Sequence, residues 1–186
     1  MAHPRLLRRD DAVLVIVDVQ ERLHREMVRR EAVASNALRL AEAAVILGMP
    51  VIVTEHAAKA FGPTIEPLRK ALPGLEPLHK ICFSCFGSEE FRAKLAALGR
   101  KQVLAAGFET HICLCQTALD ALDAGYQVHV ARDASSARSE ESHAAGLEKM
   151  AGAGVIPATA ESAIYELLGK AGTEEFRKIL PLIKRG

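Results

Sequence analysis

The stretch Val103-Leu104-Ala105-Ala106-Gly107-Phe108-Glu109-Thr110-His111-Ile112-Cys113 joins an apolar strand to a glycine turn and a cysteine. Such a run is typical of a βα unit in which a helix opens near Cys113. Two other apolar runs lead directly to charged residues, Asp18 and Lys80. Because the carboxyl ends of parallel strands meet at one edge of a sheet, we expect the acid, the base and the thiol to lie together. The helix dipole favours negative charge at a helix N-terminus, so we expect Cys113 to be a thiolate.

Short β-branched runs alternate with longer amphipathic stretches along the chain, which indicates βαβ units around a parallel sheet. Strands are expected near residues 13–18, 50–54, 78–82, 102–106, 126–131 and 154–158, and helices near residues 31–47, 88–98, 112–124, 141–152, 160–169 and 173–184. The pattern predicts a single α/β domain over residues 1–186. We expect three layers: a six-stranded, mostly parallel sheet of Rossmann-like order 3-2-1-4-5-6, with helices on both faces. In this order Asp18 and Cys113 meet where the strand order reverses, and Lys80 reaches them from the third strand.

Several segments have local signals of their own. Ser88, Ser139 and Thr173 precede helical patterns and are expected to be N-caps. Glycines and prolines interrupt the segment from Glu55 to Pro77, which predicts a loop that covers the site. The polar segment from Asp133 to Ser139 follows the fifth strand, where it could form a pocket wall, a subunit contact or a solvated loop.

The composition is that of a soluble globular protein with a self-sufficient core, with 49% apolar and 25% charged residues in a chain of 186. The formal net charge is +1 and both signs are interspersed, so the sequence predicts no binding to nucleic acid or to an anionic membrane. The apolar runs are too short for a transmembrane helix, and the first residues lack the pattern of a signal peptide. The four cysteines, at positions 82, 85, 113 and 115, are expected to be free thiols in a cytoplasmic protein.

Three motifs carry a family resemblance: Val17-Asp18-Val19-Gln20, His79-Lys80-Ile81-Cys82-Phe83-Ser84 and Gly107-Phe108-Glu109-Thr110-His111-Ile112-Cys113. In this order they resemble the three signatures of isochorismatase-like cysteine hydrolases. Further segments, Thr54-Glu55-His56, Phe61-Gly62-Pro63-Thr64 and Asp133–Ser139, are similar to the isochorismatase-domain-containing branch. The resemblance implies a catalytic triad of Asp18, Lys80 and Cys113. It also implies a cis peptide bond at Phe108–Glu109, an oxyanion hole formed by the backbone N–H groups of Glu109 and Cys113, and a homo-oligomer of two or more subunits.

This resemblance predicts a cysteine hydrolase that cleaves an amide-type C–N bond of a small-molecule substrate. Cys113 would attack the carbonyl and form a thioester, Asp18 would carry the proton to the leaving amine, and Lys80 would hold negative charge close by. Isochorismatases proper, which cleave a vinyl ether, generally lack the cysteine, so its presence favours an amidase.

Four further residues are candidates for substrate binding: Gln20, His56, Phe61 and His111. Phe83 and Phe86 are expected to belong to the core. Related nicotinamidases carry an Asp-x-His metal motif where this chain has Thr54-Glu55-His56, so no metal site is expected. The first strand is followed by Asp18-Val19-Gln20-Glu21 instead of a glycine-rich turn, so no nucleotide cofactor is expected either.

Two other classes of function stay open. The chain could be a non-catalytic interaction protein that keeps the fold and leaves the triad unused. It could also be a thiol redox protein that uses Cys82 and Cys85, whose Cys-x-x-Cys spacing would, together with Cys113 and Cys115, also suit zinc. The apolar neighbours of Cys82, Cys85 and Cys115 favour hydrophobic packing for these three.

Overall fold

The computed structural model describes residues 3–184 of the chain. Within these residues one sheet contains six strands: β1 (Ala12–Val17), β2 (Val51–His56), β3 (Leu78–Lys80), β4 (Gln102–Phe108), β5 (Gln127–Ser136) and β6 (Ile156–Ala158). Their order is β3-β2-β1-β4-β5-β6, and all five pairings are parallel. The predicted α/β fold and strand order are therefore confirmed.

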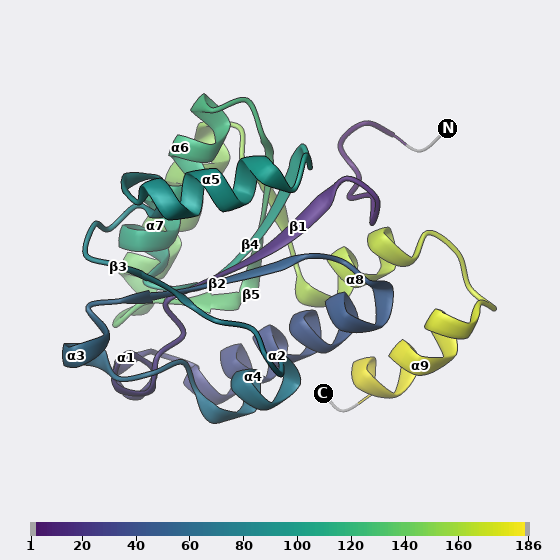
Figure 1. Cartoon of the computed structure of the whole chain (residues 1–186), viewed down its shortest axis with the longest axis horizontal. Helices are drawn as coiled ribbons and strands as arrows, with labels where there is room; N and C mark the ends of the chain where they lie inside the picture. The colour runs from purple at the N-terminus through teal and green to yellow at the C-terminus, as the bar shows by residue number, and fades with distance from the viewer. Residues whose placement is uncertain (1–2, 185–186) are drawn as a thin grey trace.

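Helices cover both faces of this sheet (Figure 1). They are α1 (Glu21–Glu26), α2 (Arg30–Leu47), α3 (Ala58–Phe61), α4 (Glu66–Ala71), α5 (Glu89–Ala97), α6 (Cys115–Asp123), α7 (Glu140–Gly152), α8 (Ala160–Leu168) and α9 (Glu174–Ile183), with a 3₁₀ turn η1 (Cys85–Gly87) and a π-helical turn η2 (Thr110–Leu114). Figure 1 shows α5, α6 and α7 on one face, and α2, α4, α8 and α9 on the other. Each face has its own buried apolar cluster, and these two clusters form the core.

Strand β1 is the centre of both clusters. All six of its residues are buried, and successive side chains point to opposite faces of the sheet. Val13, Val15 and Val17 belong to the cluster under α5–α7, whereas Leu14 and Ile16 belong to the other cluster. A strand buried on both faces explains why this stretch is a continuous apolar run rather than an alternating one.

Gly107 allows β4 to approach β1 at the edge where the candidate site lies. It pairs with Val17 and has a φ of +124°, which disfavours any residue with a side chain. A Cβ atom at this position would lie 2.0 Å from the carbonyl oxygen of Val17. Gly107 is thus required both by the backbone conformation and by the lack of space for a side chain.

Strand β5 is longer than predicted and takes in Asp133–Ser136, which the sequence pattern places after the strand. A shift in the register of β4 and β5 between Ala105 and Gly107 lets the pairing resume at Gly107 and Ser135. The buried serines are satisfied internally: Ser135 donates to the carbonyl of Ala131, and Ser136 to that of Val28. The expectation of an irregular segment is therefore wrong for these four residues.

The helix predicted at residues 112–124 also begins differently. It starts as the π-turn η2 at Thr110 and continues as α6 from Cys115. The predicted N-caps are confirmed, because the side chains of Ser88, Ser139 and Thr173 each accept a bond from the backbone N–H three residues ahead. The segment at 55–77 contains the short helices α3 and α4.

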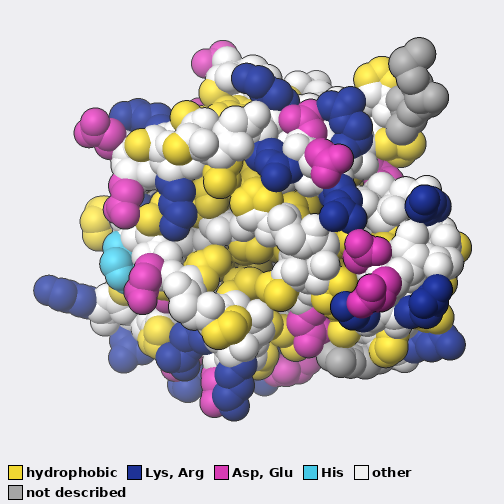
Figure 2. Space-filling model, turned by 45° about the vertical axis from the view of Figure 1, so that its right-hand side comes forward, with side chains coloured by type: hydrophobic (Ala, Val, Ile, Leu, Met, Phe, Trp, Pro, Cys, Tyr) yellow, Lys and Arg dark blue, Asp and Glu magenta, His cyan; other side chains and the backbone are white. Residues whose placement is uncertain are grey.

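The surface mixes both signs of charge. On the face drawn in Figure 2, basic and acidic side chains are interspersed around a hollow floored by hydrophobic side chains. In the part of the chain that the structure describes, no helix combines the length and the apolar character needed to cross a membrane.

Candidate active site

Three candidate residues lie at the carboxyl ends of three strands, β1, β3 and β4. Asp18 directly follows β1, Lys80 ends β3, and Cys113 lies in η2, just after β4. Asp18 has a φ of +54°, a left-handed conformation that aspartate tolerates better than most residues. Its backbone N–H donates to the carbonyl of Thr54 at 3.1 Å. This bond fixes the turn after β1 against β2.

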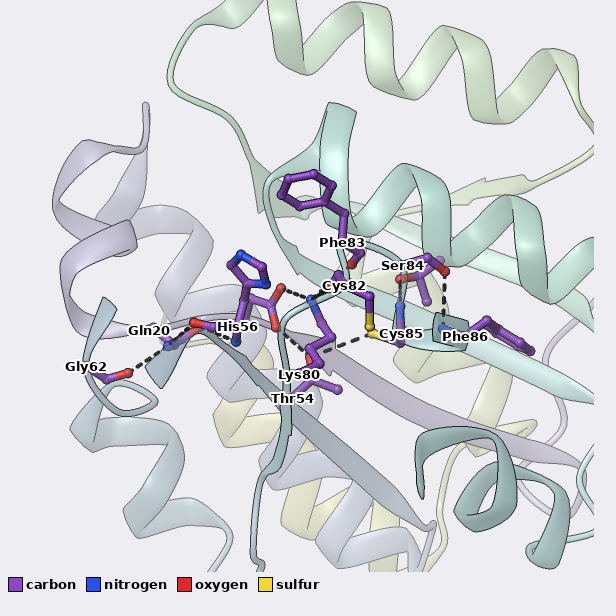
Figure 3. Close-up of polar contacts among 12 residues, drawn as sticks. Gln20, Thr54, His56, Gly62, Lys80, Cys82, Phe83, Ser84, Cys85 and Phe86 are labelled. Atoms are coloured by element: carbon purple, nitrogen blue, oxygen red, sulfur yellow. Dashed lines mark hydrogen bonds and ion pairs between the residues drawn. The ribbon is translucent and has the colours of Figure 1, made fainter. Parts of the chain in front are cut away.

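Asp18 and Lys80 form a buried ion pair. Lys80 Nζ lies 2.5 Å from Asp18 Oδ2, and the side chains are 1% and 0% exposed. The ammonium also donates to the carbonyl oxygens of Cys82 and Phe83, at 3.2 and 3.0 Å (Figure 3). Its three N–H donors therefore have three acceptors. Burial is the largest single effect and would lower the pKa of Lys80, but the Asp18 carboxylate and the sulfur atoms of Cys85 and Cys113 together outweigh it, so this pKa lies above its ordinary value.

Cys113 is a buried neutral thiol rather than the expected thiolate. The residue is 6% exposed. Burial raises the pKa of its thiol to about 12, and the negative charge of the nearby Asp18 carboxylate acts in the same direction. Lys80 opposes this effect but does not outweigh it. The prediction from the helix dipole was wrong because desolvation and a neighbouring carboxylate dominate at this position.

Helix α7 supports the turn that contains Cys113. Thr110 Oγ1 and His143 Nδ1 are 2.8 Å apart in a buried contact. Gly146 lies against the same turn, since a Cβ atom there would be 2.8 Å from the Cα of His111. The N–H groups of Ile112 and Leu114, on either side of Cys113, both donate to the Glu109 carbonyl. Contacts from α7 and within η2 thus fix the position of the thiol.

Three rings form a cluster close to the ion pair. The ring of His56 stacks on Phe61 with centroids 5.8 Å apart and lies 5.5 Å from Phe83. Burial lowers the pKa of His56, and the positive charge of Lys80 lowers it further, so the ring is neutral near pH 7. Its Nδ1 is buried and has no hydrogen-bond partner among residues 3–184, and the same holds for Nδ1 of His111.

Gln20 has a different role from the one predicted. Its Nε2 donates to the carbonyls of His56 and Gly62, at 3.0 and 2.7 Å, and its Oε1 accepts from the His56 N–H at 2.8 Å. Both N–H donors are therefore engaged, and the side chain holds the segment 56–62 in place (Figure 3). The expected substrate contact through this amide is thus replaced by a contact with the loop.

Glu55 completes the attachment of this segment, which the sequence did not indicate. Its buried carboxylate accepts from the backbone N–H and the hydroxyl of Thr64, at 2.7 and 2.8 Å. The N–H of Ala57 donates to the carbonyl of Lys80 at 2.9 Å. The predicted covering loop therefore lies at the site and is tied to Gln20, which follows β1, and to the end of β3.

The residues after β3 differ from the expectation of core packing. Strand β3 ends at Lys80, and Phe83 is 53% exposed, because the carbonyls of Cys82 and Phe83 turn inward to the ammonium. Cys82 is only half-buried, whereas Cys85 and Cys115 are buried in the apolar cluster as predicted. All four cysteines are free thiols.

The remaining predictions concern Glu109 and metals. The cis peptide bond between Phe108 and Glu109 is confirmed. The Glu109 side chain forms an ion pair with Arg138 at 2.9 Å. Among residues 3–184, no group of three or more His, Cys, Asp or Glu side chains is arranged to hold a metal ion.

Fold and site together define a three-layer α/β protein with a carboxylate, an ammonium and a thiol at the carboxyl edge of its sheet. A model of the isochorismatase domain matches residues 12–162. The chain is 35% identical over 176 residues to isochorismatase domain-containing protein 2 of Rattus norvegicus, which covers 94% of this chain and 82% of the relative. The chain therefore belongs to the isochorismatase family, and this membership supports a hydrolase.

Two solved structures are similar over nearly the whole chain. MAR1 ribonuclease from Caenorhabditis elegans superimposes with a TM-score of 0.91 at 30% identity, covering 96% of this chain and 92% of that chain. YcaC from Pseudomonas aeruginosa, described with hexane-2,5-diol and covalent acrylamide, gives a TM-score of 0.90 at 26% identity, covering 98% and 93%.

Proposed function

We propose that this protein is a cysteine hydrolase that cleaves an amide-type C–N bond of a small molecule through a thioester on Cys113. The observation that carries the proposal is that the Cys113 thiol lies within the influence of the Asp18 carboxylate, which raises the pKa of the thiol and which Lys80 holds at 2.5 Å. A neutral nucleophile beside a fixed, charged base is the arrangement that general-base catalysis requires.

In the first half of the reaction, the Cys113 thiol transfers its proton to Asp18 while the sulfur attacks the substrate carbonyl carbon. The carbonyl electron pair moves to the oxygen, which receives bonds from the backbone N–H groups of Glu109 and Cys113. When this intermediate collapses, the C–N bond breaks and the leaving nitrogen takes the proton from Asp18. An amine and an acyl thioester on Cys113 result.

In the second half, water attacks the thioester and gives its proton to Asp18. Collapse of the second intermediate breaks the C–S bond, and the sulfur takes that proton back. A carboxylic acid leaves and the neutral thiol is restored. Lys80 keeps its charge throughout, because its three N–H donors remain engaged with the protein.

His56, Phe61 and His111 are the residues we propose to contact the substrate. The unpartnered Nδ1 atoms of the two histidines can exchange hydrogen bonds with an amide group, and the ring of Phe61 supplies an apolar wall. Acrylamide, the covalent group in the YcaC structure, is a small amide that reacts with nucleophiles at its double bond and keeps its C–N bond. Its presence on that relative is a reason to include small amides among the test substrates, although the adduct itself is not a product of hydrolysis.

Three other functions, those of a ribonuclease, a thiol redox protein and an interaction protein, predict different results. A ribonuclease, which the name of the Caenorhabditis elegans neighbour suggests, would cleave RNA, but the mixed surface charge offers no argument for that activity here. A redox protein would require Cys82 and Cys85 to form a disulfide, and an interaction protein would retain binding of its partner without Cys113.

The family resemblance also predicts a homo-oligomer, whose mass light scattering would measure.

The test is a screen of small primary amides with ammonia release as the signal and intact-protein mass as a second measurement. We expect turnover of at least one amide and an acyl adduct on the Cys113 peptide. Cys113→Ala should lower the rate by about 10³-fold or more, whereas Cys115→Ala, a change of another buried cysteine two residues away, should retain it. Ammonia release that survives Cys113→Ala would refute the proposal.

A further inference from the structure

The carboxylate of Asp18 has a second donor besides Lys80. The hydroxyl of Thr54 donates to Oδ1 at 2.7 Å, while Lys80 donates to Oδ2 at 2.5 Å. Asp18 is 0% and Thr54 is 1% exposed. Because each oxygen has its own donor, rotation of the carboxylate about the Cβ–Cγ bond weakens both hydrogen bonds.

Cys85 holds the hydroxyl of Thr54 in this orientation. Its Sγ donates to Thr54 Oγ1 at 3.8 Å (Figure 3). Its backbone N–H donates to Thr117 Oγ1 at 2.9 Å. Burial raises the pKa of the Cys85 thiol to about 11, and the Asp18 carboxylate adds to this, so the thiol keeps its proton. The single proton of Thr54 goes to Asp18, so the bonds run from Cys85 to Thr54 to Asp18.

The hydroxyl of Thr54 is not needed for packing. Thr54 follows Val51-Ile52-Val53 in β2, which lies inside the sheet, where valine has the same shape and is the more usual residue. The chain nevertheless has a threonine at the position of β2 whose side chain bonds to Asp18, and a thiol rather than a methyl group behind it.

We propose that Thr54 is a positioning residue for Asp18 and that Cys85 keeps the Thr54 hydroxyl in its donating orientation. The two residues together hold the carboxylate where it can face Lys80 and the Cys113 thiol at the same time. This inference rests on the proposed function, in which Asp18 exchanges a proton with Cys113.

The test follows the alkylation of Cys113 by iodoacetamide from pH 6 to pH 10, with peptide mapping to separate it from the other cysteines. Thr54→Val removes the donor that draws negative charge from the carboxylate, so Asp18 holds the Cys113 proton more tightly. We expect alkylation about tenfold slower at pH 8, the equivalent of about one pKa unit. Thr54→Ser keeps the hydroxyl and should restore the wild-type profile.

Thr64→Val is the matched control, because it removes a buried threonine hydroxyl that donates to Glu55 instead. It should leave the Cys113 profile unchanged. Cys85→Ala should slow alkylation about threefold, since the Thr54 hydroxyl remains but is no longer oriented. Circular dichroism would reveal whether Thr54→Val folds. If it does not, the alkylation rate of Cys85→Ala tests the positioning role instead.

Asp18→Asn separates the two proposals. It removes the charge that disfavours the thiolate and leaves Lys80 beside the sulfur, so alkylation at pH 8 should become faster. If Asp18→Asn has this effect but Thr54→Val and Cys85→Ala match Thr64→Val, the positioning role is wrong and the proposed function stands. If Asp18→Asn changes nothing, Cys113 is not coupled to Asp18 and the proposed function itself fails.

Discussion

Lys80 Nζ and Asp18 Oδ2 lie 2.5 Å apart, and neither side chain is more than 1% exposed. Removal of one partner from such a pair leaves an uncompensated buried charge, whereas removal of both leaves none. We therefore expect Lys80→Met to reduce the free energy of unfolding by about 3–5 kcal/mol. The double variant Asp18→Asn/Lys80→Met should lose less than the sum of the two single variants.

Urea denaturation of the four proteins measures this coupling. Lys178→Met is the control, because it removes an exposed pair with Glu174 and should leave the denaturation midpoint unchanged. Strictly additive effects of the Asp18 and Lys80 changes would contradict the ion pair.

The raised pKa of Cys113 predicts an unusual alkylation profile. A thiol with a pKa of about 12 should react with iodoacetamide about tenfold faster for each pH unit, with no plateau up to pH 10. Lys80→Met should slow this reaction at every pH, because it removes the cation that favours the thiolate. Free glutathione, measured alongside, should level off above its ordinary thiol pKa of about 8.5. A plateau for Cys113 below pH 8.5 would restore the thiolate that the sequence predicted.

Gly146 and Gly152 lie in the same helix, α7, but face different surroundings. A Cβ at Gly146 meets the backbone of η2 at 2.8 Å, whereas a Cβ at Gly152 meets nothing within 4 Å. Gly146→Ala should displace the turn that holds Cys113 and lower the rate of amide hydrolysis by about 10- to 100-fold. Gly152→Ala should keep the rate and stabilise the protein by about 0.5–1 kcal/mol.

Hydrogen exchange offers a measurement of this contact that needs no substrate. The amides of Thr110–Cys113 should exchange faster in Gly146→Ala than in Gly152→Ala. Equal exchange in both variants would mean that η2 does not depend on the close approach of α7.

His129 makes stability depend on pH. Burial lowers the pKa of His129 to about 4, and Arg5 contributes to the shift. Between this value and the unfolded value of about 6.5 the unfolded chain binds more protons, so stability falls as the pH falls. The loss over this window should reach about 3 kcal/mol for this residue.

The free energy of unfolding at pH 7 and pH 4.5 measures this loss. His129→Gln should reduce the difference between the two values, but not abolish it, because burial lowers the pKa of His143 as well. His3→Gln, a change at an exposed histidine, should leave the difference as it is. An undiminished difference in His129→Gln would assign the pH dependence to other groups.

The alternation of strands and helices was sufficient to predict a parallel sheet, in which strands share a carboxyl edge. The order 3-2-1-4-5-6 was a hypothesis taken from Rossmann-like folds, which the structure confirms, and it is this order that brings the ends of β1, β3 and β4 together. The ionisation of Cys113 could not be predicted in this way. It depends on how deeply the sulfur is buried and on which charge is nearer, and neither quantity can be read from a local motif.

Other parts of the site depend on contacts between distant segments. The bond from Thr54 to Asp18 and the bonds from Gln20 to the 56–62 segment join residues 36 or more positions apart. Gly146 did leave a signal, because a glycine inside a helix is costly and often marks a close approach. The extension of β5 had no such signal in the sequence, since it arises from a shift in the register of β4 and β5 next to Gly107.

The attachment of the 56–62 segment through one glutamine side chain has a consequence for substrate entry. Gln20 holds both ends of this segment, and the bonds from Thr64 to Glu55 and from Ala57 to Lys80 hold it as well. Opening therefore has to break hydrogen bonds at both ends of the segment, rather than fray from one free end. While the segment stays attached, rotation of the His56, Phe61 and Phe83 side chains determines which small molecules can enter. Side-chain rotation is much faster than loop opening.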